Sequence, residues 1–152
     1  MKFTRLLALI MVVGATTIAC GDDETTGPSF TLADFVGTWL ASSATLTSEI
    51  LADSSVNLLN PPVTAVRLVV EADSTYVFAG LAGSVPVLAD TGDFVVTSNT
   101  AFLIIAADGD TLDGTYTLTN NKTTLSVNIP GTDIWIDPTF NPATLAAVFG
   151  KQ

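Results

Sequence analysis

Short stretches in which apolar and polar residues alternate cover most of the chain after Thr31. The alternation is clearest at 111–119 and 123–129, where every second side chain is apolar. A period of two places the apolar side chains on one face of a strand, so these segments are predicted to be strands with one buried and one solvent face. By the same reasoning we expect strands near Thr38–Thr47, Val63–Glu71, Thr75–Leu81, Val87–Thr97, Thr100–Ala107, Thr111–Thr119, Thr123–Ile129, Thr132–Asp137 and Thr144–Gly150.

The links between these segments are short and rich in residues that favour turns. Residues 72–74 read Ala-Asp-Ser, 98–99 read Ser-Asn, 108–110 read Asp-Gly-Asp and 120–122 read Asn-Asn-Lys. Such links join antiparallel neighbours. The predicted fold class is therefore all-β, an antiparallel up-and-down β-barrel of about eight to nine strands with a short N-terminal helix.

The pattern predicts a brief helix before the first strand. Thr31 and Asp34 have the spacing of a capping box, and Gly37 would end the helix after one or two turns. We expect it to act as a plug or lid.

Two of the predicted strands are apolar on both faces, at 68–70 and 102–105. A strand with two apolar faces is usually covered on both sides. We expect the segment Glu49–Pro62 to fold back over the wall. The alternative is that this outer surface contacts a partner or another subunit.

The first twenty residues have the layout of a secretion signal. Lys2 and Arg5 precede an apolar run at 6–13 that is too short to span a bilayer, followed by small residues. Thr17-Ile18-Ala19-Cys20 resembles the bacterial lipobox, which implies that Cys20 carries lipid and becomes the mature N-terminus. The chain then divides into a lipoprotein signal peptide at 1–19, lipidated Cys20 with a polar tether at 20–29, and a barrel domain at 30–152.

Charge narrows the set of partners. The whole chain has a net charge of −10, and without Lys2 and Arg5 three basic residues remain against fifteen acidic ones, a net charge of −12. Such a surface repels phosphate backbones and anionic headgroups. We therefore expect no nucleic-acid binding, and attachment to the membrane through the covalent lipid on Cys20. Gly at position 21, rather than Asp, favours the outer membrane of the cell envelope.

Candidate catalytic chemistry is sparse. The chain has no His and its single Cys is Cys20, which excludes intrachain disulfides, His- or Cys-ligated zinc, and mechanisms that need an imidazole base. We expect no enzyme activity, no cofactor and no metal. Two carboxylate pairs are candidates, Asp90 with Asp93 as acid and base and Asp133 with Asp137 as oxygen ligands. The opposite strand parity of Asp90 and Asp93 argues against a shared site.

The segment 108–114 has three carboxylates, Asp108, Asp110 and Asp113. It lacks the late Glu of a calcium loop, and its acids do not follow the calcium-loop spacing. A hairpin turn followed by a strand is the favoured interpretation, and calcium is the alternative. Trp135, between two Ile residues, is interpreted as core, with a partner or sugar contact as the alternative.

Several motifs resemble those of bacterial lipocalin-like domains, which are calycin-type β-barrels. Gly37-Thr38-Trp39 resembles their opening Gly-x-Trp. Residues 71–76 and 90–96 resemble the second hairpin and the fourth strand, and 114–118 with 124–127 resemble the later strands. The resemblance spans Phe30 to Gln152. It implies that Gly37, Trp39 and Lys151 form the barrel base, with the indole as a plug and the ammonium over its face.

The resemblance also implies a function. The expected role is a lipid-anchored envelope protein whose barrel binds a small apolar or amphipathic ligand, and the alternative is an envelope structural or protein-interaction module with a filled barrel. A cavity of at least about 300 Å³, mostly apolar and open at one end, favours the first. The candidate ligand-binding residues are Arg67, Tyr76, Phe78, Phe94, Phe102 and Tyr116, with Arg67 either directed outward or able to orient an acid group.

Overall fold

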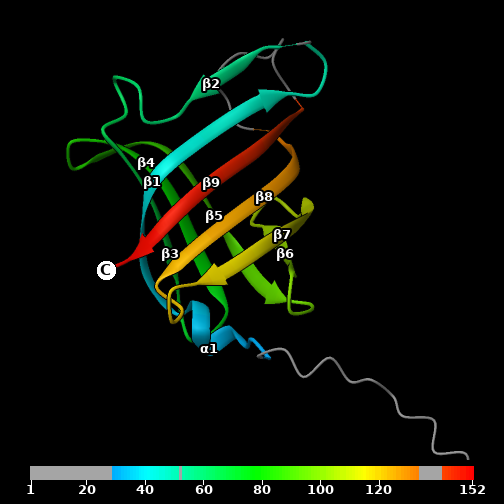
Figure 1. The fold of residues 1–152 in the computed structure, drawn as a ribbon. Coiled ribbons are helices and arrows are strands. Elements are labelled where there is room, and N and C mark those ends of the chain that lie inside the picture. Colours follow the sequence, from blue (N-terminus) through cyan, green and yellow to red (C-terminus); the bar gives the residue numbers. More distant parts are fainter. Residues whose placement is uncertain (1–28, 52, 134–141) are drawn as a thin grey trace, which may run out of the picture.

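A single antiparallel sheet that closes on itself forms the body of the protein (Figure 1). The computed structural model describes residues 29–51, 53–133 and 142–152. No helix within these ranges is long and apolar enough to cross a membrane. The described elements are α1 (Leu32–Phe35), β1 (Gly37–Ser48), β2 (Ser55–Asn57), β3 (Ala65–Val70), β4 (Thr75–Ala82), β5 (Val85–Val96), β6 (Ala101–Ala106), β7 (Thr111–Thr119), β8 (Thr124–Thr132) and β9 (Ala143–Lys151).

The barrel consists of β1 and β3 to β9, and β2 is an additional strand. Consecutive strands from β3 to β9 pair with one another, and β9 returns to pair with β1 along 39–48. The other edge of β1 is shared, because 37–40 pair with β3 and 45–47 pair with β2. The predicted all-β, antiparallel up-and-down barrel is confirmed. Closure leaves no free edge between β9 and β1, which removes a site for edge-to-edge aggregation.

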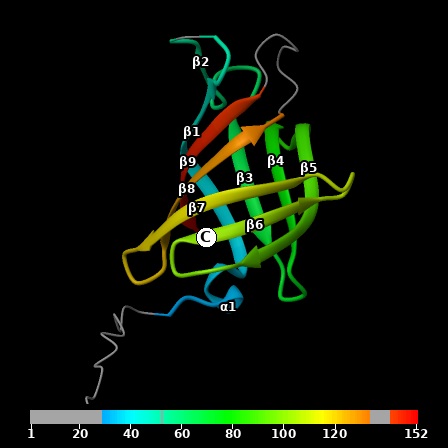
Figure 2. The same ribbon diagram turned by 90° about the vertical axis from the view of Figure 1, so that its right-hand side faces the viewer.

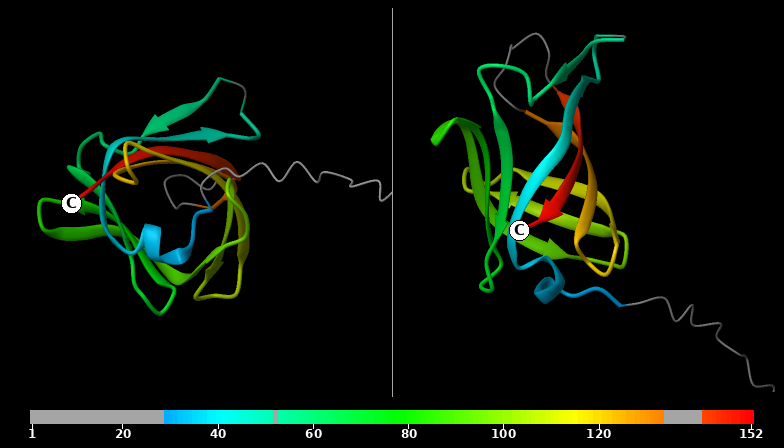
Figure 3. Two further views of the ribbon diagram at one scale, coloured as in Figure 1. Left: turned by 60° about the horizontal axis from the view of Figure 1, so that its bottom comes forward. Right: turned by 60° about the vertical axis from the view of Figure 1, so that its left-hand side comes forward.

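The two ends of the barrel differ. We call the end that carries α1 and the 71–74, 97–100 and 120–123 turns the base, and the opposite end the mouth. The β4–β5 and β6–β7 turns, the end of β8 and the start of β9 lie at the mouth. Figure 2 shows β6 and β7 running obliquely across β3, β4 and β5, and Figure 3 shows α1 lying across the ring of strands at the base.

Local hydrogen bonds hold α1 in the base. The carboxylate of Asp34 accepts a hydrogen bond from the Thr31 N–H, at 3.0 Å, as the capping pattern predicts. The helix is a single turn, and its last residue, Phe35, is fully buried. The indole Nε1 of Trp39 donates to the carbonyl oxygen of Phe35 at 2.7 Å, which ties the helix to β1.

Lys151 closes the base from the last strand. It pairs with Trp39 across β1 and β9, and its Nζ lies 5.0 Å from the centre of the indole ring. The same ammonium donates to the carbonyl oxygen of Asp34 at 3.2 Å. Gly37 has a φ of 132°, and a Cβ added there would lie 3.1 Å from Lys151 Cε. The structure thus brings Gly37, Trp39 and Lys151 together at the base.

Aromatic side chains fill the half of the interior next to α1. Phe35 packs edge-on against Tyr116, with 4.8 Å between the ring centres, and lies 5.2 Å from Phe94. Phe94 in turn stacks on Phe102 at 4.9 Å. These rings come from α1, β5, β6 and β7, so the helix and one wall of the barrel share one packed cluster.

Two expectations need correction. The segment Glu49–Pro62 was expected to fold back over the wall. Its described part instead supplies β2, which extends the sheet along β1, and the Leu58 N–H bonds to the Ala44 carbonyl. The apolar residues Val56 and Leu58 explain this, because they pack against the core from the edge of β1.

The strand expected at Thr132–Asp137 is also wrong at its start, since Thr132 ends β8 and Asp133 lies outside any strand. The remainder of that range lies outside the described residues.

Candidate functional site

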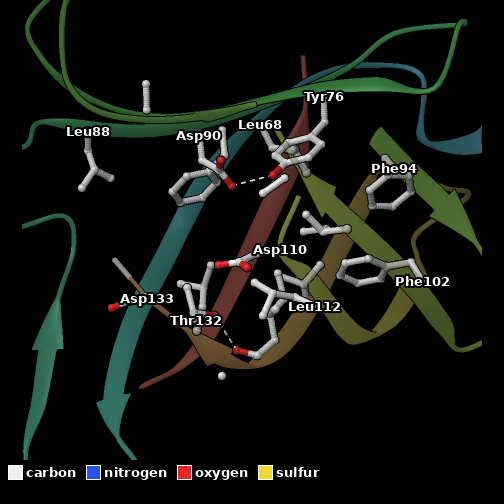
Figure 4. A pocket seen from close by; sticks show the side chains of 18 of the residues that line it. Leu68, Tyr76, Leu88, Asp90, Phe94, Phe102, Asp110, Leu112, Thr132 and Asp133 are labelled. Atoms are coloured by element: carbon white, nitrogen blue, oxygen red, sulfur yellow. Dashed lines mark hydrogen bonds between the residues drawn. The ribbon is translucent and has the colours of Figure 1, made fainter. Parts of the chain in front are cut away.

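A cavity of about 500 Å³ occupies the half of the barrel nearer the mouth. Most of the side chains around it are apolar and come from β3 to β9. At the mouth it reaches the β6–β7 turn, the start of β5 and the end of β8. Figure 4 shows this interior at close range. The lining residues are Leu68, Tyr76, Phe78, Val87, Leu88, Ala89, Asp90, Phe94, Phe102, Ile104, Ala106, Asp108, Asp110, Leu112, Val127, Ile129, Gly131, Thr132, Asp133, Leu145 and Phe149.

The distribution of side-chain size explains why the barrel is hollow at one end. The large rings of Phe35, Phe94, Phe102 and Tyr116 gather toward the base. Nearer the mouth the inward positions carry smaller side chains, such as Ala106 and Leu112. Eight strands enclose a space just wide enough for side chains or one small ligand. Because the base is filled and the side chains nearer the mouth are smaller, the barrel has room for a guest at that end.

The glycines of the inner wall do not create this space. A Cβ added at Gly114 would lie 2.3 Å from the ring of Phe102, so that ring already occupies the space. Gly80 is similarly covered by the side chain of Leu88, at 3.1 Å. These glycines serve to pack the wall.

Tyr76, which is buried, and Asp90, which is exposed, form a polar pair on the inner face of the apolar wall. They lie on neighbouring strands β4 and β5, and Phe78, next to Tyr76 on the inner face, is the direct partner of Asp90 in the sheet. The Tyr76 hydroxyl donates to Asp90 Oδ2 at 2.5 Å, and the Thr91 N–H donates to Oδ1 at 2.8 Å. Both Tyr76 and Asp90 face the cavity (Figure 4).

Burial raises the pKa of Tyr76 well above its ordinary value. The hydrogen bond to Asp90 and the charges of Asp90 and Asp108 act in the same direction, because a phenolate would lose the bond and repel both carboxylates. Tyr76 therefore remains a neutral donor. Burial likewise raises the pKa of Tyr116, whose hydroxyl donates to the Ser98 carbonyl at 2.9 Å near the base.

Three further carboxylates line the mouth of the cavity. Asp108 and Asp110 lie in the β6–β7 turn, and Asp133 follows β8. The Asp110 N–H bonds to Asp108 Oδ1 at 3.1 Å and Gly109 has a φ of 98°, which is turn geometry. In Figure 4 the carboxylate of Asp110 points into the same space as that of Asp90.

The favoured interpretation of 108–114 as a turn and strand is confirmed. Asp113 lies on the outer face of β7, away from the cavity that Asp108 and Asp110 line. Within the described ranges no group of three acidic, His or Cys side chains is placed to hold a metal ion. The argument from strand parity also holds at Asp90 and Asp93, since Asp90 lines the cavity and Asp93 is on the outer face of β5.

Four of the six candidate ligand-binding residues line the cavity: Tyr76, Phe78, Phe94 and Phe102. Tyr116 is buried in the aromatic cluster at the base and does not line the cavity. Arg67 alternates with the buried Val66 and Leu68 and pairs with Leu40 and Ala79, which places it on the outer face of β3. Of the two orientations expected for Arg67, the structure shows the outward one.

Asp90 lines the cavity although it was not among the predicted ligand-binding residues. The sequence does place Asp90 on the inner face, because it is four residues from Phe94 on the same strand and alternate residues share a face. Asp110 and Asp133 had no such signal, since turn residues have no regular parity. Cys20, Trp135 and Asp137 lie outside the described residues.

The polar groups of the cavity are few and all of them bear oxygen. They are a neutral phenol, a buried threonine hydroxyl and four carboxylates, and the hydroxyl of Thr132 already donates to the Ile129 carbonyl at 2.8 Å. The rest of the surface offers hydrophobic contact. A concave, mostly apolar site with a few polar groups is typical of small-molecule binding.

No family model matches this chain, and no curated protein matches it. Among solved structures, a redesigned β-barrel matches with a TM-score of 0.48 and 13% sequence identity, covering 80% of this chain and 94% of that one.

Proposed function

We propose that this protein is a lipid-anchored lipoprotein of the cell envelope whose lipocalin-like barrel binds a small apolar or amphipathic molecule without transforming it. The observation that carries the proposal is the cavity of about 500 Å³, which exceeds the value of about 300 Å³ that small-molecule sites require. The Gly37, Trp39 and Lys151 arrangement at the base supports the lipocalin-like assignment. The leader and Cys20 support export and lipid attachment, with Gly21 favouring the outer membrane.

The direct test is to identify a guest in the native protein. The lipoprotein would be extracted from its own membrane, washed, and analysed by mass spectrometry for small molecules that copurify with it. We expect an apolar or amphipathic compound at close to one per chain.

A matched pair of variants shows whether such a guest occupies the cavity. Ala106 lines the cavity at the end of β6, so Ala106→Phe would fill part of it. Ala146→Phe makes the same change on the exposed outer face of β9. We expect the guest to be lost from Ala106→Phe and retained by Ala146→Phe. Equal retention in both variants would contradict the proposed site.

The second candidate is a module that contacts another protein through its outer wall. Val77, Val85 and Val95, on β4 and β5, are large exposed apolar side chains and favour this function. A native protein that carries no guest, and whose interior binds no apolar probe, would favour it over ligand binding.

A further inference from the structure

The basic residues that the structure describes lie away from the cavity. Lys122 and Lys151 both hold α1 at the base, where Lys122 Nζ lies 2.6 Å from Asp34 Oδ1 and Lys151 donates to the Asp34 carbonyl. Arg67 is on the outer face of β3. Among the described residues that line the cavity, none is basic and four are aspartates. The cavity therefore has a negative electrostatic potential that no protein cation in its lining offsets.

Asp90 is the carboxylate best placed to act on a guest. It lies within the strand, beside the inward-facing Phe78 and Leu88, whereas the other acids lie at the mouth. Each of its oxygens accepts one hydrogen bond, from Tyr76 and from Thr91. A carboxylate has about four acceptor positions, so it can accept further donors. Its two existing bonds fix its orientation before a guest arrives.

The walls next to Asp90 suit a cation as well. The rings of Tyr76 and Phe78 are neighbours of Asp90 and line the same space. An aromatic face attracts a positive charge, and it does so more strongly when water is displaced. Carboxylate and ring together would bind a charged nitrogen while the apolar walls bind a hydrocarbon portion.

On this basis we propose that the guest of the barrel is an amphipathic molecule with a protonated amine, which meets Asp90 between the Tyr76 and Phe78 rings while its apolar part packs against the inner wall. The proposal rests on the binding function proposed above and specifies its ligand class. An anionic amphiphile, such as a fatty acid, would face four carboxylates with no basic side chain in the lining. A neutral one would gain only the hydrophobic contact.

The experiment compares three ligands with the same hydrocarbon chain. The full-length lipoprotein in phosphatidylcholine nanodiscs would be dialysed to equilibrium against decylamine, decanol or decanoate near neutral pH. Empty nanodiscs measure partition into the lipid, and that amount is subtracted. We expect decylamine to bind at least about tenfold more tightly than decanol, as a charge-assisted hydrogen bond implies, and decanoate to bind most weakly.

Two variants assign the preference to Asp90. Asp90→Asn removes the charge inside the cavity, and Asp93→Asn removes the same charge three positions along on the outer face of β5. We expect Asp90→Asn to bring decylamine close to decanol, and Asp93→Asn to leave the ratio unchanged. An equal loss in both variants would show a general effect of net charge and would overturn the role of Asp90.

The results distinguish a failure of the amine preference from a failure of ligand binding. If decylamine and decanol bind equally well to the unaltered chain, the barrel binds apolar guests and the preference for amines is wrong. If none of the three binds above the empty nanodiscs, ligand binding itself is wrong. The comparison among ligands uses the unaltered chain, so it stands even where Asp90→Asn fails to fold.

Discussion

The hydroxyl of Tyr76 donates a hydrogen bond to Asp90 inside the barrel, across β4 and β5 and at 2.5 Å. This bond joins a phenol that stays neutral to a carboxylate that faces a cavity without a basic side chain among its described lining residues. The pair contributes to stability and it also sets the chemistry of the site.

The first prediction concerns alkaline pH. In the unfolded chain a tyrosine ionises near pH 10, whereas in the fold the pKa of Tyr76 and that of Tyr116 are raised. Above about pH 10 the unfolded chain therefore loses protons that the folded chain keeps. The stability that the two tyrosines contribute is fully present below about pH 10 and is lost as the pH rises. Tyr76 alone should lower the free energy of unfolding by up to about 1.4 kcal/mol per pH unit.

Urea titrations between about pH 8 and about pH 11 measure this fall. The variant Tyr76→Phe keeps the ring and removes the ionisable hydroxyl, so its stability should decline less steeply in the same range. It should also be less stable near neutral pH by about 1.5–3 kcal/mol, through loss of a hydrogen bond to a charged group. Parallel pH profiles for the two proteins would contradict the assignment.

The second prediction compares two lysines that hold the same helix. Lys151→Met removes the ammonium over Trp39 and its bond to Asp34, and should cost about 1–2 kcal/mol because the site is partly buried. Lys122→Met removes an ion pair whose lysine is 44% exposed, and should cost about 0–1 kcal/mol. Chemical denaturation measures both, and a larger loss in Lys122→Met would show that the indole contact is not what stabilises the base.

The third prediction tests the packing of Phe102 against β7. In Gly114→Ala the new methyl group meets the Phe102 ring, which must move toward the cavity. We expect a loss of about 1–3 kcal/mol and weaker binding of any apolar guest. The matched change is Gly150→Ala in β9, where an added Cβ meets nothing within 4 Å. It should leave stability unchanged or raise it by about 0.4–1 kcal/mol.

The fourth prediction concerns the anchor. Cells expressing the chain and grown with a clickable fatty-acid analogue should label it, and Cys20→Ser should abolish the label, because the proposal attaches the lipid through the Cys20 thiol. The protein should fractionate with the outer membrane. A labelled Cys20→Ser chain would place the lipid elsewhere or disprove the lipobox interpretation.

The features of the fold that depend on local pattern were predictable from the sequence. Alternation at 111–119 and 123–129 places Tyr116 and Leu125 inside, as the structure shows. The turn residues at 108–110 and 120–122 join antiparallel neighbours, and Thr31 with Asp34 begins the helix. Each of these depends on contacts between residues that are close in the chain, so the sequence reports it directly.

The three-residue strand β2 was not predictable. Its segment was expected to cover the wall. The apolar pattern around Val56 and Leu58 is too short to show the alternation that is typical of a strand. Pairing with the far half of β1 decides its place, because β3 leaves that edge of β1 open beyond residue 40. Such pairing depends on where another strand ends.

For the candidate site, the sequence by itself determined which side chains could face inward, including Tyr76, Phe78, Phe94 and Phe102. Only the tertiary structure decided that the aromatic cluster gathers at the base, that Arg67 turns outward, and that a cavity with Asp90 in its wall remains toward the mouth. The physical reason is that parity is a local property of one strand. The depth of a side chain along the barrel axis depends on the tilt and register of all the strands together, and so does the volume that the side chains leave empty.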